Sequence, residues 1–429
     1  MNSGAVRARM LHRAVLSALV IAGCGHAAAQ GNKTIVLEHA DSLVGRVIDG
    51  EEARELIGAV QIRQDSVRID ADRALQYMAS GLVVLTGHVV VREDSLTIRA
   101  PRGLYHKAER RAEGFDSVSL DDGHVRLTAG YGEYFVEPRR AFFRTHVLVV
   151  DSASTVTSDS LTYYRQERRS IAEGNVTVLN QADRVTITGG RLLHVVAGDF
   201  SRMTIHPRMV QLDSAASGAF DTLVVLSRVM ESYHDTLKRL VAIDSVQIVR
   251  SDLAGIAGLA LFYTQGDSIQ LRQAPVVWYQ RTQVTGDSIN VYLLRRKLHV
   301  VRVMGEPFAI SQSDSLHPER FDQMTGETMG MFFGGQGLER IDVETHAISV
   351  YHLYDDTAGN GLNKTSGDRI IMDFDSGKVQ RIKVIGGVEG QYFPENMVRG
   401  REQEYAIPGF LLRSRRPSLR GLIAPLSAL

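Results

Sequence analysis

Two copies of a Gly-Asp-Ser-Ile block, at residues 266–269 and 286–289, contain serines that could act as nucleophiles. A catalytic serine needs a general base beside it and a third group that orients the base. In this chain the Asp-Ser pair recurs about a dozen times and leads into strand-forming residues. Because Asp and Ser side chains hydrogen-bond to their own backbone in turns, we interpret both blocks as turns.

Other residues that could carry chemistry are not grouped either. The Gly-Asp-Ser-Ile blocks at 266–269 and 286–289 resemble the block of GDSL-type lipases. In those enzymes, however, the block occurs once, early in the chain and ahead of a helix. The 14 histidines are scattered without a His-Glu-x-x-His pattern, and Cys24 is the only cysteine, so metal-ligand spacing is missing. The glycine-rich residues 334–337 do not stand between a strand and a helix, which favours a hairpin corner over a phosphate loop. We expect no catalytic residues, no metal site, no cofactor and no enzymatic activity.

Bulk charge does not identify a partner. The 429 residues contain 49 Lys and Arg and 49 Asp and Glu, so a basic excess of the kind that binds nucleic acid is lacking. The length suits two or three ordinary domains or one repetitive domain.

The N-terminus predicts export. Arg7, Arg9 and Arg13 precede an apolar run at residues 14–22, and small residues follow at 27–29. This is the pattern of a secretory signal peptide, which we place at residues 1–29. The run is too short to span a bilayer, which takes about 20 apolar residues. Cys24 leaves two alternatives open: a chance cysteine in a peptide cleaved after Ala29, or a lipobox cysteine that becomes lipidated.

An internal repeat organises the rest of the chain. Small residues in matching contexts recur at intervals of about 29 to 31 residues, a length typical of arrays: Ala71, Ala100, Ala129, Ser158 and Gly189. Looser copies continue through Ser227, Ala257 and Gly286. Within a copy, Val176 and Val178 alternate with Asn175 and Thr177, which predicts a strand with one apolar face.

Helix patterns are almost lacking, apart from a weak one at residues 51–56, whereas Val, Ile, Thr and Tyr recur between turn residues. The sequence therefore predicts an all-β fold: an elongated β-jelly roll or solenoid of about ten repeats of about 30 residues, with two facing sheets and an apolar interior. We assign residues 1–29 to the signal peptide, 30–397 to the repeated roll and 398–429 to a basic C-terminal tail, which is either mobile or a docking segment.

The repeat resembles the OstA-like family, which includes LptA-type periplasmic proteins of lipopolysaccharide transport. Residues 159–164 (DSLTYY) and 172–178 (AEGNVTV) carry the resemblance, together with residues 56–62 and 69–74. It covers roughly residues 36–393. The family implies a β-jelly roll, slightly open along one side, that stacks end to end with partners and carries lipopolysaccharide across the periplasm. This chain departs from it by having about twice the units of the short members and no large C-terminal barrel.

The resemblance implies a periplasmic lipid-binding bridge protein. Its partners would be lipopolysaccharide or a similar lipid and other envelope transport proteins, or further copies of itself, joined by end-to-end strand pairing. We expect no nucleic acid, and membrane contact that is only peripheral unless Cys24 is lipidated. On the lipid-binding inner face we place Ile69, Val89, Val91, Ile98, Leu127, Val149, Leu161, Val176, Val178, Val185, Ile187, Val246 and Ile248.

Two alternatives stay open. A structural or adhesive surface β-solenoid would have the same strands around a closed, fully packed core. A carbohydrate-active β-helix would need acidic and basic residues clustered on one stacked face, and we find no such cluster in the sequence. The paired arginines at corners, such as Arg110-Arg111 and Arg168-Arg169, could meet phosphates at the rim of the interior or could protect exposed turns and strand edges.

Overall fold

The computed structural model describes residues 36–64, 67–93, 95–152, 154–214, 220–233, 238–263, 266–294, 297–313, 317–335, 337–355, 358–375 and 378–423. The predicted signal peptide and Cys24 lie outside these residues. The described chain is all-β with antiparallel strands, as the sequence predicts, and it divides into two compact units. Unit 1 comprises the described residues up to Pro207 with Tyr233, and unit 2 comprises 208–232 and the described residues from Lys238 on.

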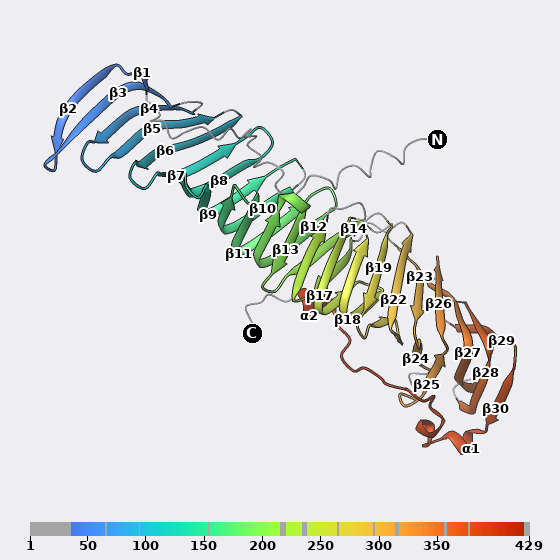
Figure 1. The fold of residues 1–429 in the computed structure, drawn as a ribbon. Helices are drawn as coiled ribbons and strands as arrows, with labels where there is room; N and C mark the ends of the chain where they lie inside the picture. The colour runs from blue at the N-terminus through green and yellow to red at the C-terminus, as the bar shows by residue number, and fades with distance from the viewer. Residues whose placement is uncertain are drawn as a thin grey trace, which may run out of the picture. The chain divides into compact units, whose positions relative to one another are not determined.

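Unit 1 is built from long strands that pair with their neighbours in sequence (Figure 1). The strands are β1 (Val36–His39), β2 (Ser42–Ile48), β3 (Glu51–Gln64), β4 (Val67–Tyr77), β5 (Leu82–Glu93), β6 (Leu96–His106), β7 (Arg111–Asp121), β8 (Arg126–Phe135), β9 (Arg140–Val150), β10 (Ser154–Tyr164), β11 (Arg169–Asn180), β12 (Val185–Val195) and β13 (Phe200–Thr204), and a short 3-10 turn, η2 (Val196–Gly198), precedes β13.

A corner divides each long strand of unit 1 into two halves. In β3, Gly58 and Ala59 both have positive φ and stand opposite one residue of β4, which is a β-bulge. Equivalent pairs with positive φ follow at intervals of 29 residues: 87–88, 116–117, 145–146 and 174–175. Because the strand turns at each bulge, its first half pairs in one sheet and its second half in another. We call the sheet containing β2 the first sheet and the one containing β1 the second sheet.

The corner selects its residues by conformation and space. Gly, Asn, Asp and His tolerate the left-handed region better than most residues, and they provide most of the corner positions. At Gly174, a Cβ would lie 2.2 Å from Oδ2 of Asp159 on the neighbouring strand. The same carboxylate accepts a hydrogen bond of 2.9 Å from Asn175 Nδ2. Asp159 thus supports the corner of β11 from within β10, so the turn expected at residues 159–160 is wrong: these residues are strand, and the turn lies at 174–175 of the neighbouring strand.

Unit 2 has the same two-sheet plan, with several strands interrupted at the corner. The strands are β14 (Arg208–Ser214), β15 (Phe220–Leu226), β16 (Val229–Tyr233), β17 (Arg239–Val249), β18 (Leu253–Tyr263), β19 (Ser268–Arg272), β20 (Val276–Tyr279), β21 (Thr282–Thr285), β22 (Ser288–Leu294), β23 (Lys297–Met304), β24 (Phe308–Gln312), β25 (Phe321–Thr325), β26 (Thr328–Gly334), β27 (Gly337–Asp355), β28 (Ala358–Asp375), β29 (Lys378–Ile385) and β30 (Glu389–Phe393).

The two sheets of unit 2 are joined by its continuous strands. β19, β22, β23 and β26 pair in series in one sheet, while β20, β21, β24 and β25 pair in the other. β18 and β27 pair with both series. Both Gly-Asp-Ser-Ile blocks lead into strands of the first series, and Asp287 donates its backbone N–H to the carbonyl of the corner residue Gly305 at 2.9 Å. Ser268 and Ser288 are thus the first residues of β19 and β22, and the turn or bend lies at the Gly-Asp before each serine.

The C-terminal segment packs back onto unit 2. It contains α1 (Glu395–Val398), the 3-10 turn η3 (Glu402–Tyr405) and α2 (Leu419–Ile423). Val398 and Ile407 are buried against β24, β27 and β28, and Leu422 is buried against β15, β18 and β20. We call residues 395–423 the C-terminal strap. Of the two alternatives for the tail, its described part shows packing onto the chain's own roll.

Two buried glutamines hold the backbone of the strap. Gln323 Oε1 accepts a 2.8 Å hydrogen bond from the N–H of Ile407. Gln283 donates through Nε2 to the carbonyl of Leu411 at 2.8 Å and accepts through Oε1 from the N–H of Arg413 at 2.7 Å. Both amides project from sheet strands and are almost fully buried, so the strap is hydrogen-bonded as well as packed.

An ion pair anchors the start of the strap. Arg320, which is 1% exposed, donates through Nη2 to Glu395 Oε1 at 2.6 Å, and its Nε lies 3.6 Å from Glu402 Oε1. Burial alone would raise the pKa of Glu395, but hydrogen bonds from Arg320, the Gly361 N–H and Arg399 outweigh it and hold that pKa below its usual value. Removing one partner of a buried pair leaves an uncompensated charge.

The corner glycines give a first test. We expect Gly174→Ala to lower the free energy of unfolding by about 3 kcal/mol, because left-handed strain adds to the clash with Asp159. Gly50 is the matched control, since it also has positive φ (82°) but no atom lies within 4 Å of a Cβ built there. Gly50→Ala should cost only about 1 kcal/mol. Equal losses in urea denaturation of the two variants would contradict the steric role of the corner.

The strap anchor gives a pH-dependent test. Because the pKa of Glu395 is lowered by folding, its stabilisation is complete above the ordinary carboxyl pKa and is lost as pH falls through the lowered value. Glu395→Gln should destabilise unit 2 by about 3 kcal/mol at neutral pH and by progressively less at acid pH. Exposed Glu404, paired with Arg401 on the surface, is the control, and Glu404→Gln should change stability far less than Glu395→Gln at every pH, because solvent screens an exposed pair. Chemical unfolding of both variants between pH 7 and 3 measures the difference.

Candidate functional site

The candidate site is the apolar inner face between the two sheets of unit 1. Val60, Ala71 and Val89 of the second sheet form one buried cluster with Ala74 and Leu85 of the first. The sheets therefore face each other across these side chains.

The inner face repeats with the corners. The first inner residue after each corner is a valine, and these valines are 29 residues apart and 1–5% exposed: Val60, Val89, Val118, Val147 and Val176. Each lies directly across from one small residue of the sequence repeat, in the order Ala71, Ala100, Ala129, Ser158 and Gly189. Small residues are required at this point because the strand turns there and the opposite sheet is close.

Glycines on the first sheet contact the corner valine closely in the middle of unit 1. A Cβ on Gly114 of the first sheet would lie 2.8 Å from Cγ2 of Val118 in the second, and one on Gly132 would lie 3.2 Å from Cγ1 of the same residue. In this part the next inner row is fully buried, with Leu120, Leu127, Val149 and Val156 at 1–5% exposed. Protein side chains alone fill the interior there.

The inner residues are less fully buried on either side of strands β7 to β10. The residues of the same row on β3 to β6 are only partly buried, and they pair across the strands as Ile62 with Ile69 and Val91 with Ile98. On β11 and β12 the pair Val178 and Ile187 is partly buried too. These strands have paired neighbours on both sides, so the exposure is not that of a sheet edge.

The residues predicted for the inner face fall into two groups by burial. Fully buried are Val89, Leu127, Val149, Leu161, Val176, Val246 and Ile248. Partly buried are Ile69, Val91, Ile98, Val178, Val185 and Ile187. All belong to unit 1 except Val246 and Ile248, which lie on β17 of unit 2.

Sequence reasoning missed several residues of the same face. Val60, Val118 and Val147 complete the valine series, and their 29-residue spacing was the signal that could have found them. From the first sheet the inner face also receives Leu85, Phe143, Leu192 and Met203, all under 8% exposed. Their spacing is less regular, because glycines occupy the equivalent positions 103, 114 and 132.

The outer face of unit 1 is polar and ordered. Arg102 lies over the ring of Phe115 at 4.7 Å, and Arg144 lies over Tyr131 at 4.6 Å. Tyr131 donates to Glu113 at 2.7 Å, and Arg111 pairs with the same carboxylate at 2.7 Å. The paired arginines at hairpin turns have local partners, since Arg110 pairs with Glu137 and Arg169 lies over Tyr164. Their geometry supports the turn and edge-protection interpretation.

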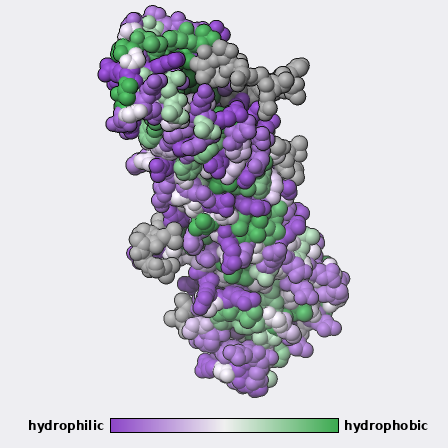
Figure 2. Space-filling model, turned by 60° about the vertical axis from the view of Figure 1, so that its left-hand side comes forward, coloured by the Kyte–Doolittle hydropathy of each residue, from purple (hydrophilic) through white to green (hydrophobic). Residues whose placement is uncertain are grey.

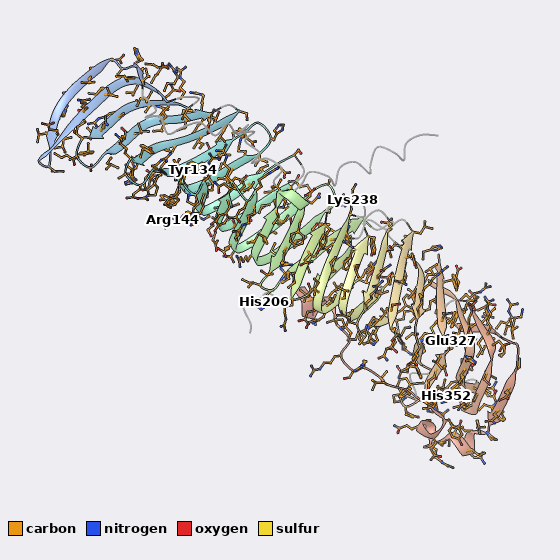
Figure 3. All side chains as sticks on the ribbon, in the orientation of Figure 1. Tyr134, Arg144, His206, Lys238, Glu327 and His352 are labelled. Atoms are coloured by element: carbon orange, nitrogen blue, oxygen red, sulfur yellow. The ribbon has the colours of Figure 1, made fainter. Side chains whose placement is uncertain are left out.

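One cluster of Ser, His and Asp occurs in unit 2. Asp322 Oδ1 accepts from Ser313 Oγ at 2.6 Å, and the buried His352, labelled in Figure 3, places Nδ1 3.2 Å from the same oxygen. In a catalytic triad the serine hydroxyl bonds to the imidazole nitrogen opposite the carboxylate. Here the same imidazole nitrogen, Nδ1, lies 3.3 Å from Ser313 Oγ and 3.2 Å from Asp322 Oδ1, so the ring does not stand between serine and carboxylate as in a triad, and the cluster ties β25 to β27.

Two other kinds of site are not found in the described part of the chain. No group of three or more His, Cys, Asp or Glu residues there could hold a metal ion. No helix among those residues is long and apolar enough to cross a membrane.

The ends of the units leave strand edges and apolar surface. Within the described ranges, β1 and β2 pair only with β3, and β29 and β30 pair only with β28. Apolar side chains on β1 and β2 are exposed, including Leu37 at 43%, Leu43 at 59% and Val47 at 71%. Figure 2 shows green, apolar surface at the top of the view, the height at which Figure 1 draws these strands.

Comparison with known proteins gives a family match that lies within unit 1. Residues 32–185 match the family model described as OstA-like protein. Among solved structures, the chain is similar to LptH, described as the LptA homologous periplasmic component of the conserved lipopolysaccharide transport device from Pseudomonas aeruginosa. The identity is 16% and the TM-score 0.26, covering 33% of this chain and 95% of that one. No curated protein matches the chain. Residues 32–185 are therefore similar to the OstA-like family, which confirms the resemblance predicted from the repeat for that part of the roughly 36–393 it was expected to cover.

Proposed function

We propose that this chain is a periplasmic lipid-binding bridge protein of cell-envelope assembly, which carries lipopolysaccharide or a similar lipid toward the outer membrane. The observation that carries the proposal is the inner face of unit 1, where apolar side chains on fully paired strands stay partly exposed. The OstA-like match over residues 32–185 covers most of the same unit. The proposal includes no catalytic step and no cofactor.

The physical need for such a protein is large. Each CH₂ group moved from water to an apolar site gains about 0.8 kcal/mol, so a lipid with several acyl chains meets a barrier of tens of kcal/mol in an aqueous compartment. An apolar face between two sheets lowers that barrier without chemistry. The partly buried pairs, such as Val91 with Ile98, offer such a face, whereas the closed surface solenoid that is the main alternative would bury them fully.

We propose end-to-end pairing as the mode of assembly. The free edges of β2 and β29 offer unpaired backbone N–H and C=O groups to an added strand. Other envelope transport proteins or further copies of this chain would supply that strand. Exposed Leu43 and Val47 on β2 would be covered at the same time.

The lipid site can be tested at neighbouring positions. A photo-crosslinker at inward Val178 or Ile187 should capture lipid in cells, while one at outward Thr177 or Thr186 should not, because alternate strand residues face opposite sides. Mass spectrometry of the crosslinked protein identifies the captured species. Equal capture at all four positions, or none at any, would favour the closed structural solenoid.

Export of the protein can be tested by identifying its mature N-terminus. We propose that residues 1–29 are removed on export, because arginines, an apolar run and the small residues 27–29 follow in the required order. Intact-mass measurement of the exported protein should give a chain that begins at Gln30. A mass that includes a lipid-modified Cys24 would instead assign a membrane-anchored protein, and a chain that begins at Met1 would contradict export.

A further inference from the structure

The two units differ in how fully their interiors are packed. In unit 1, four inner-face residues packed against the cluster around Val60 are only partly buried: Leu56, Ile62, Ile69 and Val83. In unit 2, the inner residues of the β19, β22, β23 and β26 series are nearly inaccessible. They are Ile269, Leu271, Ile289, Val291, Val301, Val303, Met329, Met331 and Phe333, of which only Ile269 and Phe333 exceed 2% exposure.

Side chains from both sheets fill the interior of unit 2. Val277, Val284, Ala309 and Met324 of the opposite series are 1–5% exposed. Tyr279 of β20 contacts Phe333 of β26 edge to face, with ring centroids 4.9 Å apart. Methionines and aromatic rings adapt to irregular space, so they close an interior that smaller aliphatic residues would leave open.

The strap locks one sheet of unit 2 from outside. All four residues of β20 are buried: Tyr279 faces the interior, while Val276 and Trp278 pack against Leu422 of the strap. On β24, Phe308 and Ile310 pack against Val398 and Ile407, and Ala309 lies on the other face. This sheet is therefore covered on both sides. Moving it outward would break its bonds to the strap, including those of Gln283 and Gln323.

We propose that the lipid is held by unit 1 alone, and that the interior of unit 2 stays closed to lipid. This inference rests on the proposed function. Within unit 1 the lipid chains lie where inner residues are partly exposed, at β3 to β6 and at β11 and β12, and the fully buried inner residues Leu120, Leu127, Val149 and Val156 of β7 to β10 separate the two places. Because protein side chains fill the interior of unit 2 along these strands, lipid leaves unit 1 without passing between the sheets of unit 2.

Crosslinking at equivalent inner positions distinguishes this inference from the proposed function. The crosslinker is placed at Val91 in unit 1 and, in separate variants, at Val291 and Val303 in unit 2. Capture of lipid at Val91 and at neither unit 2 position is the expected result. Capture in both units, or in unit 2 alone, would overturn the inference and leave the proposed function standing. Absence of capture at all three positions would overturn the proposed function, and the inference with it.

A crosslinker is bulky and can misfold a variant in the packed interior of unit 2. Cysteine substitutions are smaller and test the same inference. In a Cys24→Ser background, which removes the only native cysteine, Val91→Cys should react with a maleimide, and purified lipopolysaccharide should slow the reaction at least about fivefold. Val90→Cys, on the opposite face of β5, is the matched control and should react without protection. Val291→Cys, at a position 2% exposed, should stay unreactive in the folded protein. Reaction of Val291→Cys as fast as that of Val91→Cys, with the same protection, would contradict a closed unit 2.

Discussion

The structure depends on one backbone constraint: a strand that must belong to two sheets has to turn within itself. Two consecutive residues in the left-handed region achieve this at each corner, and a β-bulge absorbs the extra residue. The valine after the corner then points inward against a small residue of the next strand. The corner determines the positions of this valine and of its small partner. The inner valines of unit 1 therefore have the same 29-residue spacing as the corners.

The space between the sheets is controlled by which side chains follow the corner. Glycines 114 and 132 allow close approach to Val118, and the inner residues beside them are fully buried. Where valine and isoleucine face each other without that approach, as with Val91 and Ile98, they stay partly exposed. In unit 2 larger methionine and aromatic side chains fill the same kind of space. The same architecture can therefore be a binding face or a packed core, depending on a few residues per repeat.

Much of the fold was readable from the sequence because the repeat is local. The series Ala71, Ala100, Ala129, Ser158 and Gly189 identified the turning points, and strand alternation identified the inner residues near Val176. The weak helical pattern at residues 51–56 gave way to strand β3, since pairing with β2 and β4 outweighs a marginal helical preference over so short a segment. Strict use of the 29-residue spacing from Val89 and Val176 would also have predicted Val118 and Val147 as inner residues.

Two features could not be predicted from the sequence in this way. The docking of the strap depends on Val398, Ile407 and Leu422, whose spacing follows no helix or strand period because their partners come from distant strands. The degree of exposure of Val91 or Ile187 depends on the distance between sheets. That distance is set by residues on the opposite sheet and not by the strand that carries them.

The strap also determines how freely each unit can vary in length. In unit 1, cutting between two corners and removing 29 residues would rejoin a valine to its small partner in the same register. In unit 2, Ile407 must reach Gln323 and Leu411 must reach Gln283 along one stretch of chain. The length of the strap between these two hydrogen-bonded positions therefore fixes how many strands can lie between the strands that carry Gln283 and Gln323.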